Sequence, residues 1–255
     1  MKIGVFDSGI GGLHILHACV KAVDATFFYY GDNENAPYGT KSEREIMELT
    51  RQAFDLFEKI GVQVAIIACN TVTAVCIDRL RREYPFYIIG TEPALSLARG
   101  NCLLLATRAT LSAKRISMLI ERFPALKVTK FAPDGLVEDI ERNIDSLSAV
   151  NLSFLDDRKE DCTVLGCTHF CWVKDRIERK IPVFDGTEGV ARRLLAYCKD
   201  KESVFSQKPG KVNHRFFSSG AENRFFVKTV EKSTIFFLGS GFLRNSTVYE
   251  QMFVM

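Results

Sequence analysis

The chain has 255 residues, of which 47% are hydrophobic and 25% charged, and its 34 basic and 31 acidic side chains leave a formal net charge of +3. This composition excludes a disordered chain, a coiled coil and a collagen-like repeat, and it suffices for one large or two modest domains. The small charge excess gives no reason to expect nucleic acid as the main partner, whereas an acidic small molecule is compatible with it.

No apolar stretch reaches the roughly 18 residues needed to span a bilayer, and Met1 runs directly into an apolar strand pattern without the layout of a signal peptide. We therefore expect a soluble, cytoplasmic protein without a membrane partner. In that compartment the eight cysteines are expected to be thiols and not a disulfide framework.

Short apolar runs alternate with polar turns and helical patterns, which is typical of parallel sheets with helices on their faces. In chain order the predicted strands are 3–6, 26–30, 62–68, 86–90, 102–106, 128–131, 162–166, 182–184, 215–218 and 235–238. So many strands suit two sheets better than one. The predicted fold class is therefore α/β, with mainly parallel sheets.

The helix that follows residue 41 has the clearest signals in the chain. Ser42 and Glu45 have the spacing of a capping box, apolar residues recur on one face as far as Ile60, and Gly61 ends the pattern. Further helices are predicted at 12–23, 72–83, 113–123, 136–144, 170–179, 188–199 and 222–230.

Two strand ends resemble each other although they lie in different halves of the chain. Residues 66–71 read IIACNT and residues 164–169 read VLGCTH. Each segment places a cysteine and polar residues between a predicted strand and a predicted helix, which is where ligands bind in parallel α/β sheets. The repetition indicates two related lobes that face a shared cleft.

Cys69 and Cys167 are the cysteines of these two segments. A thiol at a helix start has its pKa lowered from about 8.5 towards neutrality by the helix dipole and the unpaired amides, which makes the sulfur a usable base or nucleophile. One such cysteine alone is more simply interpreted as a small buried residue. Two cysteines in matching polar contexts favour a catalytic role for both.

Three kinds of chemistry use cysteine pairs differently. A nucleophilic enzyme needs one thiol with a histidine, as Cys167 with His169, and leaves Cys69 redundant. A redox pair usually has Cys-x-x-Cys spacing, which the sequence lacks. Two-base proton transfer uses both sulfurs, because one thiolate removes a proton from a stereogenic carbon while the opposite thiol supplies one to the other face. Inversion of configuration follows.

Other polar residues near the predicted strand ends have alternative interpretations. Asp7 either accepts a proton from the substrate ammonium, tunes Cys69, or caps the next helix. The glycines after it resemble a dinucleotide fingerprint, but His14 stands where the third glycine belongs, so no nicotinamide site is expected. The turn at 32–39 either offers amides to a distal carboxylate or is a plain surface loop.

A metal site is not expected either. Cys167, His169 and Cys171 would begin one, but no second Cys/His pair completes it. The cysteines assigned to the core are Cys19, Cys76, Cys102, Cys162, Cys171 and Cys198.

Without a cofactor, the site must exclude water and hold the substrate carboxylate on donors such as Asn70 and Thr71.

Taken together, these segments resemble the glutamate racemase family. The matching stretches are 6–12 (FDSGIGG), 30–32 (YGD), 37–39 (PYG), 68–71 (ACNT), 92–93 (EP) and 165–169 (LGCTH), with Ser219, Gly220 and Phe225 as the last motif. The resemblance implies two similar α/β domains with the active site in the cleft between them. Residues 1–94 plus 211–255 would form the first domain and residues 95–210 the second.

By this resemblance the protein is an isomerase that interconverts L- and D-glutamate without cofactor or metal and supplies D-glutamate for peptidoglycan. Cys69 would deprotonate D-glutamate with help from Asp7. Cys167 would deprotonate L-glutamate with help from His169. The substrate-binding residues would be Asp7, Ser8, Pro37, Tyr38, Gly39, Cys69, Asn70, Thr71, Thr107, Thr110, Glu138, Cys167, Thr168 and His169.

Two alternatives stay open, namely a racemase of aspartate or another small acidic amino acid and a non-catalytic amino-acid-binding relative. The resemblance also allows a homodimer. Residues 132–137, before Glu138, are shorter and more polar than the corresponding segment of the family, and Cys171 with Trp172 replaces small or proline residues.

Overall fold

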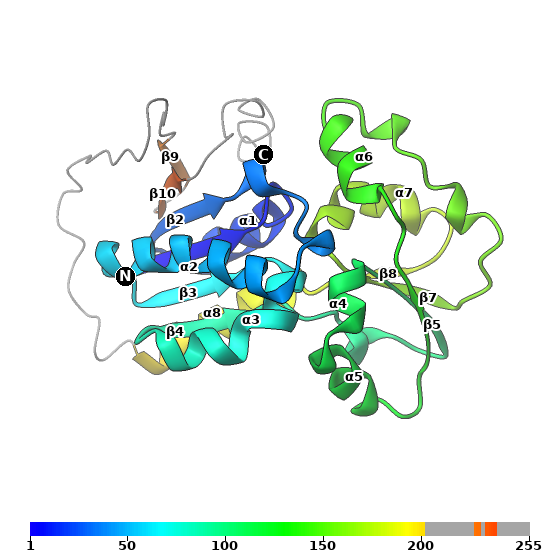
Figure 1. Cartoon of the computed structure of the whole chain (residues 1–255), viewed down its shortest axis with the longest axis horizontal. Coiled ribbons are helices and arrows are strands. Elements are labelled where there is room, and N and C mark those ends of the chain that lie inside the picture. Colours follow the sequence, from blue (N-terminus) through cyan, green and yellow to red (C-terminus); the bar gives the residue numbers. More distant parts are fainter. Residues whose placement is uncertain (202–226, 231–232, 239–255) are drawn as a thin grey trace.

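The computed structural model describes residues 1–201, 227–230 and 233–238, and these residues form two lobes, each built around one sheet (Figure 1). The first sheet has six strands in the order β4-β3-β1-β2-β10-β9, and the second has four in the order β6-β5-β7-β8. Every neighbouring pair is parallel except β10 and β9. None of the described helices is long and apolar enough to cross a membrane.

The strands are β1 (Lys2–Asp7), β2 (Thr26–Gly31), β3 (Val64–Ile67), β4 (Tyr87–Gly90), β5 (Asn101–Ala106), β6 (Lys127–Phe131), β7 (Cys162–Gly166), β8 (Val183–Phe184), β9 (Val227–Val230) and β10 (Ser233–Leu238). The α-helices are α1 (Leu13–Ala22), α2 (Glu43–Ile60), α3 (Asn70–Glu83), α4 (Arg108–Ser112), α5 (Lys114–Glu121), α6 (Leu136–Arg142), α7 (Lys174–Glu178) and α8 (Thr187–Lys201).

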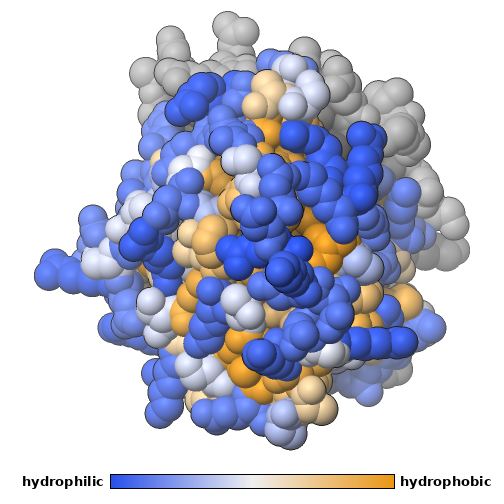
Figure 2. All heavy atoms as spheres, turned by 90° about the vertical axis from the view of Figure 1, so that its right-hand side faces the viewer, coloured by the Kyte–Doolittle hydropathy of each residue, from blue (hydrophilic) through white to orange (hydrophobic). Residues whose placement is uncertain are grey.

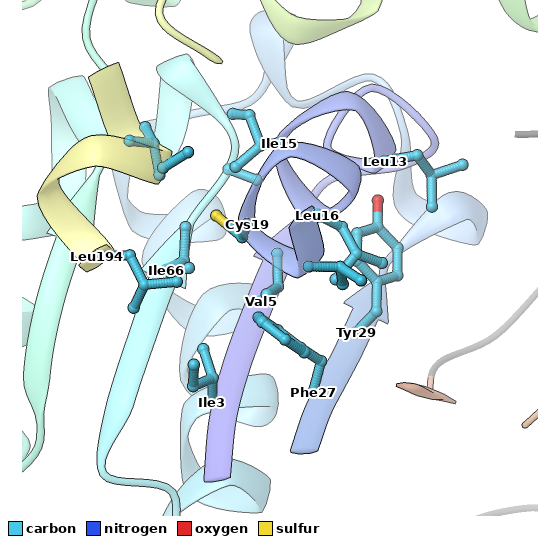
Figure 3. Close-up of a cluster of buried hydrophobic side chains, with 14 of the residues drawn as sticks. Ile3, Val5, Leu13, Ile15, Leu16, Cys19, Phe27, Tyr29, Ile66 and Leu194 are labelled. Atoms are coloured by element: carbon cyan, nitrogen blue, oxygen red, sulfur yellow. The ribbon is translucent and has the colours of Figure 1, made fainter. Parts of the chain in front are cut away.

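Helices cover both faces of the first sheet, which explains why its strands read as nearly continuous apolar runs. On one face, side chains of α1 and α8 meet those of β1 and β2, and Figure 3 shows Leu16 and Cys19 close to Val5 and Phe27, with Leu194 next to Ile66. The other face is covered by α2 and α3. Because both faces are covered, the polar residues of this sheet concentrate at its strand ends.

The predicted start and end of α2 are confirmed. Ser42 Oγ accepts a hydrogen bond from the Glu45 amide at 3.3 Å, and Glu45 Oε2 accepts one from the Ser42 amide at 2.9 Å. Gly61 ends the helix with φ at +75°, a left-handed conformation that glycine adopts without steric cost.

The second sheet is covered in the same way. Side chains of α5 pack on one face, and those of α6, α7 and the 3-10 segment Thr168–Val173 pack on the other. The outer surface of this lobe is mostly hydrophilic, with smaller patches of hydrophobic residues between (Figure 2). The apolar side chains of this lobe therefore serve mainly to hold its helices onto the sheet.

Four sequence-based expectations need revision or a limit. The helix predicted at 113–123 is two helices, because Thr107 caps the unpredicted α4 and α5 begins separately at Lys114. The helix predicted at 170–179 begins as a 3-10 segment. The helix predicted at 222–230 is wrong for Val227–Val230, which form β9 against β10, as the alternating Val-Lys-Thr-Val sequence allows. The strand predicted at 215–218 lies outside the described residues.

The chain passes from the first lobe to the second after β4 and returns after β8, since α8 packs against α1. Val190, Ala191 and Leu194 of α8 belong to the core of the first lobe. The predicted division of the chain into 1–94 with 211–255 and 95–210 remains a prediction.

Candidate active site

The two cysteines of the similar strand ends lie at corresponding places in the two lobes. Cys69 follows β3 by two residues and precedes the first residue of α3, and Cys167 directly follows β7. Both are buried, with 5% and 6% of their surface exposed. The charge of Cys167 is one of the smaller causes, after burial and the charge of Asp7, that raise the pKa of Cys69.

Asp7 connects the lobes beside these sulfurs. It ends β1, is fully buried, and accepts hydrogen bonds from the Gly9 amide at 2.9 Å and from the Thr168 hydroxyl of the second lobe at 3.2 Å. Burial raises the pKa of Asp7, although the charge of His169 and these hydrogen bonds oppose the rise. A proton acceptor of increased basicity therefore sits where the lobes meet.

Cys69 has a polar environment that is low in positive charge. Its sulfur lies 3.4 Å from Ser8 Oγ. Burial, and next the charge of Asp7, raise the pKa of Cys69 to about 12, against the opposing effects of Ser8 and the Val72 amide. The prediction of a lowered pKa is therefore wrong for Cys69, because removal of the sulfur from water outweighs the helix start.

The environment of Cys167 contains a buried imidazole instead. His169 is 2% exposed, hydrogen-bonds to Cys167, and its Nε2 lies 2.7 Å from Glu141 Oε1. Burial alone would lower the pKa of His169, but the bonds to Cys167 and Glu141 outweigh it and hold the pKa well above its ordinary value. These two contacts therefore favour the protonated form of His169.

Glu141 was not singled out from the sequence, although Glu138 was. Glu138 is exposed and lines a cavity of about 70 Å³ with Pro37, Gly39 and Thr107. The two glutamates are three residues apart on α6, so they lie on neighbouring positions of one helix face. That spacing is the signal by which the sequence could have pointed to Glu141.

Three threonine hydroxyls form a triangle between α3 and α4. The oxygens of Thr71, Thr107 and Thr110 lie 2.9, 3.1 and 2.9 Å apart in pairs. Asn70, at the first turn of α3, is buried and donates to the Thr91 carbonyl at 3.3 Å. These hydroxyls and the amides at the helix start suit a carboxylate.

The turn at 32–40 packs against the second lobe. Tyr38 donates its hydroxyl to Asp32 Oδ2 at 2.6 Å, and Asn35 donates to Asp32 Oδ1 at 2.9 Å. Burial, followed by the charge of Asp32, raises the pKa of Tyr38. A Cβ on Gly39 would lie 2.6 Å from the Cβ of Thr107, so glycine permits this close approach. Asp32, which was named only as the start of the turn, holds the turn together.

The glycines after Asp7 make a second close contact between the lobes. A Cβ on Gly11 would lie 2.6 Å from both the backbone nitrogen of His169 and Thr168 Oγ1. A Cβ on Gly9 would lie 2.9 Å from Glu141 Oε1. Glycine is needed at these positions because the backbone of one lobe touches the functional residues of the other.

Most other residues considered above pack in the core. Cys19, Cys76, Cys102 and Cys162 are buried, whereas Cys171 and Cys198 are partly buried and pack against the cores from their edges. The eight cysteines all lie in the described residues, and none of them forms a disulfide. Within the described part of the chain, no group of three or more His, Cys, Asp and Glu is arranged to hold a metal ion. Ser219, Gly220 and Phe225 lie outside the described residues.

Comparison with known proteins assigns a family. The profile of the Asp/Glu/Hydantoin racemases matches residues 3–194. A protein of Clostridium acetobutylicum named glutamate racemase is 38% identical over 209 residues, which are 75% of this chain and 82% of that protein.

Two solved structures share the fold. Escherichia coli glutamate racemase, in complex with L-glutamate and the activator UDP-MurNAc-ala, has a TM-score of 0.68 and 30% identity over 77% of this chain and 82% of that chain. Glutamate racemase from Francisella tularensis, in complex with D-glutamate, has a TM-score of 0.69 and 26% identity over 81% of this chain and 84% of that chain. The predicted α/β fold class is confirmed, and the chain belongs to the Asp/Glu/Hydantoin racemase family.

Proposed function

We propose that this protein is a glutamate racemase that transfers protons at Cα between the thiols of Cys69 and Cys167. The observation that supports this most directly is the pair of buried sulfurs at the ends of β3 and β7, at the junction where Thr168, next to Cys167, donates a hydrogen bond to Asp7. A protein that only binds an amino acid has no need of two such thiols. The names and bound ligands of the relatives support glutamate over aspartate.

The reaction is a balanced exchange of one proton. The Cys167 thiolate takes the Cα proton of L-glutamate, the Cα–H bond breaks, and its electron pair remains on the substrate as a carbanion. The Cys69 thiol then gives its proton to the opposite face, which forms D-glutamate and leaves a Cys69 thiolate. In the reverse direction the two sulfurs exchange roles.

The surroundings of the two sulfurs suit this order. With a pKa of about 12, Cys69 is a neutral thiol at neutral pH and is ready to donate. On the side of Cys167, a protonated His169 stabilises a neighbouring thiolate. A turnover near 10 per second corresponds to a barrier of about 16 kcal/mol, so the pKa of the Cα–H acid can exceed that of its base by no more than about 12 units.

The remaining predicted residues are proposed to hold the substrate. The hydroxyls of Thr71, Thr107 and Thr110 and the amides at the start of α3 would bind one carboxylate, and the turn that contains Tyr38 would bind the other. Because both sulfurs are buried, the lobes must separate for the substrate to reach them. The proposed role is to supply D-glutamate for peptidoglycan in the cytoplasm, and the homodimer remains a prediction.

The test is solvent exchange in D2O with pure L- or D-glutamate, with aspartate alongside. We expect loss of optical rotation and deuterium at Cα with glutamate, and loss of both signals in Cys69→Ser and in Cys167→Ser. Faster exchange with aspartate than with glutamate would show that aspartate is the preferred substrate. A wild type that binds glutamate but exchanges no Cα proton would show that the protein only binds amino acids.

A further inference from the structure

We propose that Arg115 is a positioning residue that fixes the pivot between the lobes. Together with Glu92 and Asp78 it keeps one end of α3 against the second lobe while the other end, at Thr71, opens to admit the substrate. The inference deepens the proposed function and rests on it, since a site with buried sulfurs has to open. The sequence motifs do not include Arg115 or Asp78, and they include Glu92 only as part of a matching stretch.

Helix α3 of the first lobe lies beside α4 and α5 of the second, where the lobes meet (Figure 1). Near its start, the Thr71 hydroxyl is within hydrogen-bond distance of two threonine hydroxyls of α4. Ala74 and Val75 pack against the core of the second lobe, and Asp78 contacts Arg115 of α5. Positions three and four residues apart share one face of a helix, so this face follows the second lobe from the candidate active site to Asp78. The interface therefore has two ends, which are about two turns of helix, or about 10 Å, apart.

Arg115 connects three segments of the chain at the end away from the sulfurs. Its Nε and Nη2 lie 2.8 and 2.6 Å from Glu92 Oε1, and its Nη1 lies 3.2 and 3.3 Å from the two carboxylate oxygens of Asp78. Glu92 belongs to the linker 91–100 between β4 and β5, Asp78 to α3 and Arg115 to α5. The side chains of Arg115 and Glu92 are 28% and 34% exposed, so solvent screens this contact only in part. A guanidinium that serves two carboxylates holds its geometry better than an isolated surface pair.

A cavity of about 580 Å³ lies beside these ion pairs. It is lined by Asp78, Glu92 and Arg115 together with apolar residues of α3 and α5, among them Ala74 and Met118. Side chains do not fill this part of the interface. The ion pairs of Arg115 therefore bridge an opening between α3 and α5 that apolar packing does not close.

A rigid body that turns about a point moves most at the places farthest from that point. The linker 91–100, which contains Glu92, is where the chain first crosses between the lobes. Because Arg115 ties this linker and α3 to α5, the lobes can turn with little movement at Asp78 and larger movement at Thr71. Without Arg115 both ends can separate, so open arrangements become more populated and closure on the substrate costs more.

In Arg115→Met we expect KM for glutamate to rise about 5- to 10-fold with kcat within about twofold, because apparent affinity falls with the fraction of molecules able to close. The dissociation constant of D-glutamate, measured by titration calorimetry, should rise by the same factor. Arg115→Lys keeps the charge but loses the planar fork, so both values should lie between those of the wild type and Arg115→Met. The difference between wild type and Arg115→Met should shrink at high salt, since screening weakens the wild-type ion pairs.

Arg51→Met is the matched control. Arg51 donates to both carboxylate oxygens of Glu83, at 3.0 and 2.7 Å, and the two side chains are 34% and 31% exposed. This pair resembles that of Arg115 but joins α2 to α3 within the first lobe, so its loss should leave KM and kcat unchanged. Asp78→Asn removes only the contact with α3. It should raise KM less than Arg115→Met does and add nothing to it in the double variant.

Hydrogen–deuterium exchange of the full chain, followed by mass spectrometry, reports opening without turnover. In Arg115→Met we expect faster exchange in the linker 91–100 and at the start of α5. The first turn of α3, about 10 Å away, should also exchange faster although it has lost no contact. Saturating D-glutamate should slow the exchange there again. Faster exchange confined to the neighbours of Arg115 would show a local structural role and overturn the proposal.

The outcomes keep the two proposals apart. A wild type that exchanges no Cα proton refutes the racemase, whereas D-glutamate binding and amide exchange still report on the pivot. A wild type that racemises glutamate, with KM unchanged in Arg115→Met or raised equally in Arg51→Met, refutes the pivot alone. If Arg115→Met does not fold, the Asp78→Asn variant carries the test, because Asp78 is 66% exposed, and an unchanged KM in it overturns the proposal.

Discussion

The two sides of the cleft present the same atom, a buried sulfur at a strand end, in different surroundings. Cys69 lies beside Ser8 and the buried Asp7, and its pKa is raised to about 12. Cys167 lies beside an imidazole whose pKa is itself raised by its contacts with Cys167 and Glu141.

The difference shows how a reaction that runs equally in both directions is compatible with an asymmetric site. In the proposed racemisation each sulfur is a thiol in one direction and a thiolate in the other. Burial and the charge of Asp7 raise the pKa of the thiol on the first side, whereas the thiol on the second side lies beside the His169–Glu141 pair. The similar backbones set the positions of the two sulfurs, and the groups around them differ.

The largest effect is expected when the two sides are forced apart. Gly11→Ala introduces a Cβ that would lie 2.6 Å from Thr168 Oγ1 and from the His169 backbone nitrogen, so the lobes must shift. A misplacement of roughly 1 Å costs about 100-fold in turnover, and we expect a loss of that order without loss of helical circular dichroism.

Gly189→Ala is the matched control for this prediction. Nothing lies within 4 Å of a Cβ at this helical position, so the variant should keep its turnover and gain up to about 1 kcal/mol of stability. Normal turnover in Gly11→Ala would contradict the close contact of the lobes.

The hydrogen bond that crosses the cleft is the next point of comparison. Thr168→Val removes the donor to Asp7 Oδ1 and leaves a buried carboxylate oxygen without this partner, which costs about 1–3 kcal/mol. We expect turnover to fall about 10-fold, as a transition-state loss of roughly 1.4 kcal/mol gives.

Thr163→Val makes the same substitution at an earlier position in the chain. Thr163 lies on β7, and its buried hydroxyl has no hydrogen-bond partner, so its loss should be neutral or stabilising in thermal unfolding. Equal losses of turnover in the two variants would show that the Asp7 contact has no special role.

The histidine of the second side should make stability depend on pH. The folded pKa of His169 lies above its unfolded value of about 6.5, so its contribution is complete below pH 6.5 and is lost as pH rises through the folded pKa. Urea unfolding as a function of pH should show this decline in the wild type and less of it in His169→Gln. An identical decline in both proteins would assign it to other groups.

The smallest effect on activity is expected for a cysteine outside the cleft. Cys102 is fully buried in the core of the second lobe, so Cys102→Ala should cost about 1–3 kcal/mol of stability and leave kcat within about twofold. A folded Cys102→Ala protein without turnover would contradict the distinction between core and reacting cysteines.

Local patterns in the sequence predicted many of the helices and strands. The capping box at Ser42, the end of α2 at Gly61 and the strand at 162–166 depend on neighbouring residues, and the structure has each of them as predicted. The two cysteines at matching strand ends were also visible, because a strand followed by a helix is read from periodicity alone.

Only the tertiary structure decided what surrounds those cysteines. The raised pKa of Cys69 comes from burial and from Asp7, which is 62 positions away in the sequence, since 69 − 7 = 62. The contact of Glu141 with His169 and that of Asp7 with Thr168 join segments whose spacing in the chain carries no signal of proximity. Periodicity reports on neighbours along the chain, whereas charge, desolvation and close contact depend on which surfaces the two lobes bring together.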